Sequence, residues 1–199
     1  MSTDPPTIDP RKRPRQARAA ATFDAILEAA ARILEKDGIE SVNTNAVAEL
    51  AGVSVGSLYQ YFPTKESILA ELVRFNRSIL KEKVETAVAQ GTGKTLEETI
   101  DLLLDAAVLH QLERPELALK LEQVESVLPL DNETVALTEA IADDVAKLLS
   151  AHNVSDPDQA SRDIVALVRG IVDAAGLAKE VDQAGLHRRL RRAVLGYLS

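Results

Sequence analysis

The chain reads as a series of amphipathic helical segments. From Thr22 onward, apolar residues recur at i, i+3 and i+4, the spacing that places them on one face of an α-helix. No stretch alternates with the period of two that is typical of a half-buried β-strand. The first segment ends at Gly38, a usual C-terminal stop. The pattern therefore predicts an all-α fold.

Two short helices follow the first one. The stretch "NTNAVAELA" predicts a second helix that Asn43 or Thr44 caps, with Val47 and Leu50 facing inward. After a tight turn at Gly52, residues 54–62 predict a third helix, which a proline ends. A helix, a glycine-centred turn and a second helix form the helix-turn-helix pattern.

A long helix separates this region from the rest of the chain. Residues 64–90 predict one continuous helix of about 40 Å at ~1.5 Å per residue, and "GTGK" at 91–94 is the clearest internal break. The remaining pattern predicts helices at about 96–113, 116–127, 133–151, 158–179 and 183–198. We therefore expect a disordered basic, proline-rich arm (1–17), a helix-turn-helix domain (18–66) and a helical domain (67–199) for effector binding and dimerisation.

The third helix predicts a surface for reading DNA. Leu58 and Phe62 lie one turn apart and should pack inward, which leaves the other residues of the helix for contact. These other residues are Val55, Gly56, Ser57, Tyr59, Gln60 and Tyr61. Small residues let a helix sit deep in the major groove, where serine bonds to base edges, valine meets a thymine methyl and glutamine pairs with adenine. The two tyrosines suit phosphate and sugar contacts.

Three further polar residues flank this helix. Thr44 stands at the start of the second helix, where free backbone N–H groups attract phosphate, and Asn45 is beside it. Lys65 lies in the first turn of the fourth helix, where a cation is disfavoured unless it grips an anion. Periodicity alone leaves a second interpretation open, in which three core helices are joined by ordinary turns.

Composition and charge agree with this picture. Three of the six aromatic residues crowd into positions 59–62, more than a small core needs. The net charge is −8, but it is divided: residues 1–83 carry +1 and residues 84–199 carry −9. The arm contains the basic run Arg11, Lys12, Arg13, Arg15 and Arg18. A locally basic end on an acidic body is compatible with DNA binding, because charges act over about 10 Å.

The last two helices predict a subunit interface. Helix 158–179 is apolar on nearly every face, so we expect it to be buried on two sides, and Gly170, Ala174 and Gly176 permit close approach of helices. Helix 183–198 has leucine and valine in steps of four, and four arginines that indicate a solvated face or pairing with a partner's acidic residues. A two-fold homodimer is the commonest arrangement for such a surface.

Polar residues that interrupt apolar stripes are candidates for a small-molecule effector site. His110 continues the stripe of helix 96–113, Gln111 is beside it, and Glu122 interrupts the next helix. A histidine of this kind is otherwise a core or rim residue. The three histidines lack metal-ligand spacing, so no metal site is expected.

Several classes of protein are excluded or disfavoured. Without cysteine there is no disulfide or thiolate site, and no phosphate loop, nucleophile elbow or HExxH motif indicates an enzyme or a cofactor. The N-terminus lacks the apolar core of a signal peptide, and no apolar run is long enough to span a membrane. We therefore expect a cytoplasmic protein.

Residues 22–72 resemble the N-terminal domain of the TetR family of bacterial transcriptional regulators. The most specific part is "AELAGVSVGSLYQYFPTKESIL", which combines "AGVS", a small residue before "LY", then "YF" and the lysine. By position, the family's DNA contacts correspond to Thr44, Asn45, Val55, Gly56, Ser57, Tyr59, Gln60, Tyr61 and Lys65. Val55 departs from the polar or basic residue that is common at its position.

The resemblance implies a homodimeric repressor that binds a palindromic operator and leaves it when a small molecule binds the C-terminal domain. We expect this ligand to tilt the fourth helix and so to change the separation of the two recognition helices. It also places the dimer interface on the last two helices. Two alternatives stay open: a DNA-binding activator or architectural regulator without a small ligand, and a helical protein-interaction module.

Overall fold

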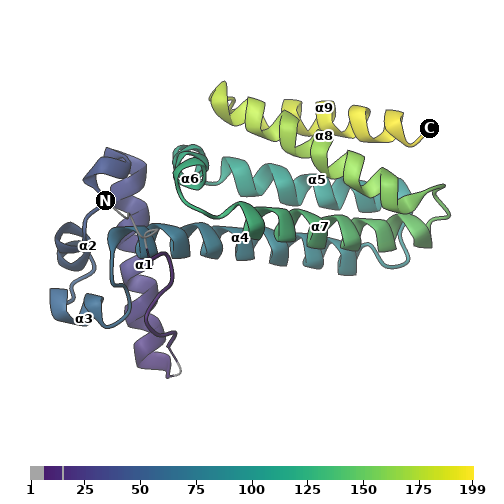
Figure 1. Ribbon diagram of the computed structural model, residues 1–199. Helices are drawn as coiled ribbons and strands as arrows, with labels where there is room; N and C mark the ends of the chain where they lie inside the picture. The colour runs from purple at the N-terminus through teal and green to yellow at the C-terminus, as the bar shows by residue number, and fades with distance from the viewer. Residues whose placement is uncertain (1–6, 15) are drawn as a thin grey trace, which may run out of the picture. The chain divides into compact units, whose positions relative to one another are not determined.

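In a computed structural model, residues 7–14 and 16–199 of the chain are described, and these residues form only helices and connecting turns (Figure 1). The predicted all-α class is confirmed. In chain order the elements are α1 (Ala17–Asp37), a 3-10 turn (Ile39–Ser41), α2 (Thr44–Leu50), α3 (Val55–Tyr59), α4 (Lys65–Gln90), α5 (Leu96–Leu112), α6 (Pro115–Val127), α7 (Asp131–Ala151), α8 (Pro157–Leu177) and α9 (Gln183–Tyr197).

The chain packs as two compact units. The first contains the residues up to Asn76 and a second segment, Leu119–Leu130; the other contains Arg77–Ala118 and Asp131–Ser199. α4 and α6 therefore each begin in one unit and end in the other. The boundaries expected from the sequence, at 17/18 and 66/67, divide the chain by function, whereas these two units divide it by packing. The functional division stays a prediction.

The first unit is held by an aromatic centre between α1, α3 and the start of α4. The ring of Phe23 in α1 lies 4.9 Å from that of Phe62 and meets Tyr61 edge to face at 5.8 Å. Leu58 and Phe62 are completely buried, as the helical spacing predicts. Burying each side chain stabilises the unit by about 1.5–3 kcal/mol, so α3 is fixed on α1 although it has only five residues.

The described part of the N-terminal arm is folded against the first unit. The sequence predicts a disordered arm over 1–17, of which residues 1–6 and Arg15 lie outside the described residues. The backbone N–H of Arg11 donates to the carbonyl of Tyr61 at 2.7 Å, and α1 already begins at Ala17. The prolines therefore disfavour a helix in the arm, but its described residues still pack against the first unit.

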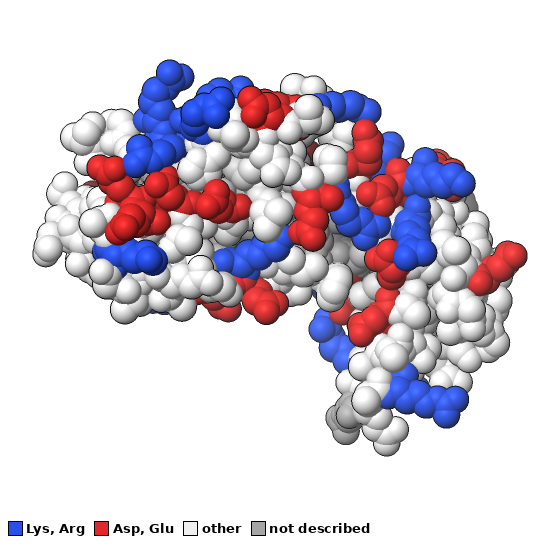
Figure 2. Space-filling view, turned by 180° about the vertical axis from the view of Figure 1, so that it is seen from behind, with Lys and Arg blue, Asp and Glu red and all other residues white. Residues whose placement is uncertain are grey.

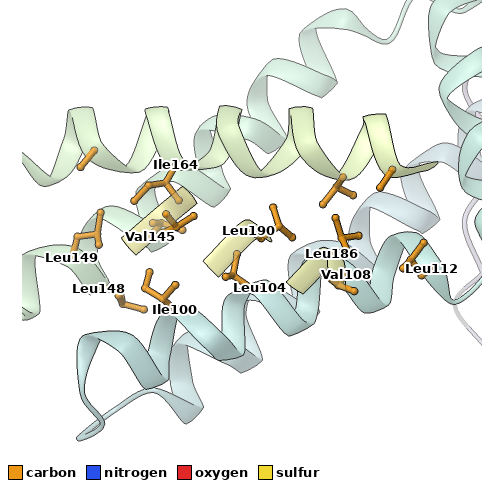
Figure 3. Packing of buried hydrophobic residues seen from close by; sticks show 14 residues of the cluster. Ile100, Leu104, Val108, Leu112, Val145, Leu148, Leu149, Ile164, Leu186 and Leu190 are labelled. Carbon is orange, nitrogen blue, oxygen red and sulfur yellow. The ribbon is translucent and has the colours of Figure 1, made fainter. Parts of the chain in front are cut away.

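The second unit is built on α5, α7, α8 and α9. α7 packs along α8, while α5 contacts both α8 and α9. Figure 3 shows Leu104 and Val108 of α5 facing Leu190 and Leu186 of α9, and these four side chains are buried. The steps of four in α9 thus bury one of its faces within its own chain.

The arginines of α9 pair with acidic residues of the same chain. Arg191 donates to Glu97 at 2.7 Å and to Asp101 at 2.9 Å, both on α5, and Arg189 donates to Glu180 at 2.6 Å. Basic and acidic side chains lie next to one another on the face of this unit that Figure 2 shows. Arg188, Arg189 and Arg192 are exposed, as a solvated face predicts, whereas Arg191 is half-buried beside α5. Pairing with a partner's acidic residues stays a prediction.

Candidate nucleic-acid interface

Local capping sets the geometry of the helix-turn-helix. The Asn43 side chain accepts from the backbone N–H of Ala46 at 2.9 Å, so Asn43, not Thr44, caps α2. Gly52 follows α2 with φ at 67°, a left-handed conformation that favours glycine. The Ser54 hydroxyl then accepts from the N–H of Ser57 at 3.0 Å and begins α3.

The outer face of α3 is formed by small and polar residues. Val55, Gly56, Tyr59 and Gln60 are exposed, whereas Ser57 is half-buried and its hydroxyl lies 2.8 Å from that of Ser54. A Cβ on Gly56 would meet only the Ser54 hydroxyl, at an ordinary 3.9 Å, and its φ does not require glycine. The fold of this chain therefore does not explain why position 56 has no side chain.

Two predicted phosphate contacts meet on this face. The hydroxyls of Thr44, on α2, and Tyr59, on α3, lie 3.2 Å apart, and the Tyr59 side chain is 39% exposed. Asn45 is exposed next to Thr44. One hydroxyl of the pair donates to the other, so the pair can offer one further O–H to an incoming oxygen. Lys65 is the first residue of α4 and half-buried.

Tyr61 differs from its expected position. Its side chain is only 7% exposed, and its ring packs on Phe23, so it does not form an open wall of the surface. The physical reason is that α3 ends at Tyr59, after which the chain bends and turns the next tyrosine inward. Leu50 shows the opposite error: it is exposed, and Ala48 takes the inward position on α2.

The structure also brings a residue that the motif does not include to this surface. The ammonium of Lys12, in the arm, lies 3.4 Å from the side-chain oxygen of Gln60 and 5.0 Å from the centre of the Tyr61 ring. The basic run of the arm was the only sequence signal for it, because nothing in the pattern indicates where the arm lies.

The three candidate effector residues fall in different places. Gln111 is buried on α5, and its amide nitrogen has no hydrogen-bond partner in the part of the chain that the structure describes. His110 is half-buried beside it; burial, reinforced by the nearby Lys83, lowers the pKa of its imidazole to about 4. Glu122 belongs to the first unit, whereas His110 and Gln111 belong to the second, so neither unit by itself unites all three.

Residues 7–14 and 16–199 contain neither a candidate metal cluster nor a candidate membrane span. Within these ranges no three histidine or acidic side chains gather as a metal ion would require. No helix in the same part of the chain combines the length and the apolarity needed to cross a membrane.

Comparison with known proteins identifies both regions of the chain. Residues 26–72 match the family described as "Bacterial regulatory proteins, tetR family", and residues 95–198 match "Tetracyclin repressor-like, C-terminal domain". The second match alone covers more than half of the 199 residues.

Individual relatives match shorter parts of the chain. The chain is 39% identical over 66 residues to the transcriptional repressor KstR of Mycolicibacterium smegmatis, which covers 33% of this chain and 32% of that one. It is 30% identical over 87 residues to the A-factor receptor protein of Streptomyces griseus, which covers 44% of this chain and 29% of that one. The chain thus spans about a third of the length of these curated relatives.

A solved structure extends the likeness to nearly the whole fold. A putative TetR-family transcriptional regulator from Mesorhizobium loti matches with a TM-score of 0.75 and 19% identity, over 92% of this chain and 98% of that one. At that identity the match shows the fold only. With the two family matches, it leads to one conclusion: the chain belongs to the tetR family of bacterial regulatory proteins.

Proposed function

We propose that this chain is a homodimeric transcriptional repressor that binds a palindromic DNA operator through α3 and leaves it when a small molecule binds the second unit. KstR, a relative over a third of this chain, is named a transcriptional repressor. The exposed face of α3 and the Thr44–Tyr59 hydroxyl pair support DNA as the ligand of this unit.

Gly56 is the observation that carries this proposal. A glycine inside a helix costs up to about 1 kcal/mol relative to alanine, and here the chain has room for a methyl group. A glycine that the fold does not need is explained if another molecule must approach the backbone closely. A DNA duplex makes such an approach when α3 enters its major groove, because Gly56 lies between Val55 and Ser57 on the face that would meet the base edges.

The neighbouring residues receive distinct roles in this proposal. Ser57 and Gln60 read base edges, and Val55 meets a thymine methyl. Tyr59, Thr44, Asn45 and Lys65 contact the phosphate backbone and orient α3. Tyr61 supports α3 from inside, because its ring is buried against Phe23.

Apolar side chains on α8 and beyond it support the homodimer. Leu177 is 66% exposed and Val181 89% exposed, and Ala174 is also exposed on α8. A stripe of exposed apolar and small residues on a helix that is buried on its other side favours a second copy of the same helix as partner.

Release by a ligand is a shift between two states. Two recognition helices fit one operator when they lie about 34–36 Å apart, one turn of the duplex. α4 begins at Lys65, beside the interface, and continues to Gln90 in the second unit, so a movement of its second half is transmitted to Lys65. The buried amide of Gln111 is the candidate anchor for the effector, because its nitrogen has no acceptor within residues 7–14 and 16–199.

The proposal is tested by adding one methyl group at position 56 and measuring stability and DNA affinity separately. In Gly56→Ala we expect an unfolding free energy about 0.5–1 kcal/mol higher in urea, because alanine favours the helix. Affinity for an operator selected from random duplexes should fall at least tenfold, measured by fluorescence anisotropy, because the methyl group meets the groove. Ser150→Ala, at an exposed helical position of α7 and outside the expected dimer interface, is the control and should leave DNA affinity unchanged. Unchanged affinity in Gly56→Ala would contradict the role of α3.

A further inference from the structure

Residues 7–13 form a strap that crosses the C-terminal end of α3 and the start of α4. Three hydrogen bonds to backbone atoms hold it. The N–H of Arg11 donates to the carbonyl of Tyr61 at 2.7 Å. The Thr64 hydroxyl donates to the carbonyl of Thr7 at 3.0 Å, and the Arg74 guanidinium donates to the carbonyl of Ile8 at 3.0 Å. Backbone contacts of this kind do not depend on the residue types of the strap.

A cluster of ion pairs fastens the same strap to α4. Arg13 donates to the Glu71 carboxylate at 3.1 Å, and Arg74 lies 3.5 Å from Glu71 and 3.0 Å from Asp9. The Glu71 side chain is only 7% exposed, whereas that of Arg13 is 66% exposed. A buried carboxylate is costly unless cations compensate it, and Glu71 receives this compensation from Arg74 of α4 and from Arg13 of the strap.

The strap presents the Lys12 ammonium at the DNA face. Lys12 lies between the exposed amide of Gln60 and the ring of Tyr61, at 3.4 Å and 5.0 Å. Both contacts are weak, because a neutral amide and an aromatic ring at an exposed site each attract an ammonium only modestly. A phosphate oxygen beside Gln60 would bind it more strongly.

We propose that Lys12 is a DNA phosphate contact, and that the strap, held by the Glu71 carboxylate, preorganises it next to α3. This inference rests on the proposed DNA-binding function and extends its surface beyond the helix-turn-helix. An arm that is already ordered avoids the conformational entropy cost of ordering several residues on binding. Glu71 acts through the strap and is a positioning residue.

The phosphate contact is tested by salt dependence with the full-length protein. Lys12→Ala should weaken binding to the selected operator and to sheared genomic DNA by a similar factor. It should also reduce the slope of log affinity against log salt by about 1, as the loss of one phosphate contact does. Lys147→Ala, an exposed lysine of α7 in the second unit, changes the net charge equally and should leave the slope unchanged.

The strap is tested without DNA by limited proteolysis. Trypsin cleavage after Arg11, followed by mass spectrometry, should be about tenfold faster in Arg13→Ala and in Glu71→Gln than in wild type, because the ion pair that closes the strap is lost. Both residues of the Arg11–Lys12 bond are unchanged in these variants. Arg13 is exposed, so Arg13→Ala keeps the experiment valid if Glu71→Gln affects folding. Both variants should also lose DNA affinity, although neither removes Lys12.

The outcomes separate this inference from the proposed function. If Tyr59→Ala weakens DNA binding while Lys12→Ala keeps wild-type affinity and slope, Lys12 is not a phosphate contact and the repressor proposal stands. Wild-type proteolysis rates in Arg13→Ala would overturn the strap. If the wild-type protein binds no duplex at any salt concentration, both proposals fail together.

Discussion

At the scale of single residues, the structure separates positions that the fold needs from positions that it tolerates. Gly52 has a φ of 67° and is required by the turn, whereas Gly56 has ordinary helical geometry and free space around it. Both belong to one glycine-containing motif, but only the first is explained by backbone conformation. In the proposed function, Gly56 is explained by the DNA that approaches α3.

Gln111 is another residue whose identity the fold does not explain. Its buried amide nitrogen has no partner, and a Cβ on Gly176 of α8 would come within 2.5 Å of that nitrogen. α5 and α8 thus pack closely around a polar group that an apolar one could replace. A buried donor without an acceptor costs about 1–3 kcal/mol.

We therefore expect Gln111→Met to raise the unfolding free energy by about 1 kcal/mol, because it removes the orphaned donor and keeps the volume. Urea unfolding followed by circular dichroism measures the change. Gln123→Met, at an exposed position of α6, is the control and should remain within about 0.5 kcal/mol. A less stable Gln111→Met protein would mean that the amide already has a partner.

At the scale of elements, one histidine joins two distant helix ends. His152 follows α7; its Nδ1 lies 2.9 Å from the carbonyl oxygen of Leu148, and its Nε2 lies 3.1 Å from that of Lys94. Carbonyl oxygens only accept, so the ring makes both bonds only when both nitrogens carry protons. These backbone hydrogen bonds raise the pKa of His152 above its usual value.

The raised pKa predicts a pH dependence with a definite sign. Because the folded pKa exceeds the unfolded one, His152 contributes its full stability below the unfolded pKa of about 6.5 and loses it as pH rises through the folded value. The difference in stability between wild type and His152→Gln should therefore shrink from pH 5.5 to pH 8.5. Thermal melts recorded at intervals of about one pH unit measure this difference.

His110 does not disturb this comparison, because it titrates equally in both proteins. Its own lowered pKa, about 4, has the opposite effect, since it removes stability as pH falls below about 6.5. A difference that grew with pH would show that His152 is neutral in the folded protein.

Helix existence follows closely from the sequence, whereas orientation at helix ends does not. The predicted range 133–151 corresponds to Asp131–Ala151, and 183–198 to Gln183–Tyr197, because long periodic stripes leave few alternatives. α3 was expected to reach Phe62 but ends at Tyr59, which turns Tyr61 inward. A shift of three residues at a helix end thus moves one aromatic residue from the surface into the core.

The sequence pattern does not predict contacts between elements that are far apart in the chain. The strap is an example: its basic and proline residues indicate an exposed arm, but its backbone hydrogen bonds to Tyr61 and Thr64 leave no trace in residue type. The residues of the candidate site on α3 could be predicted, because one helix carries them. The prediction missed Lys12, because tertiary packing brings that residue to the site.

At the scale of the whole molecule, the proposed function requires two copies of α3 on one operator. Each α3 has only five residues, so one copy reads a few base pairs, and affinity for a specific site depends on the second copy. The surface that would join the copies is expected on α8 and α9, where Ala174 and Leu177 remain exposed.

We expect Ala174→Arg to abolish dimerisation, because it places a charge in the middle of an apolar interface that pairs the same residue with itself. Analytical ultracentrifugation should give the mass of one chain, against two for wild type, and operator affinity should fall more than tenfold while helicity is retained. Ser150→Arg, at an exposed site on α7, adds the same charge and should stay dimeric. A dimeric Ala174→Arg protein with wild-type affinity would place the interface elsewhere, and the spacing of the two recognition helices would then need a different origin.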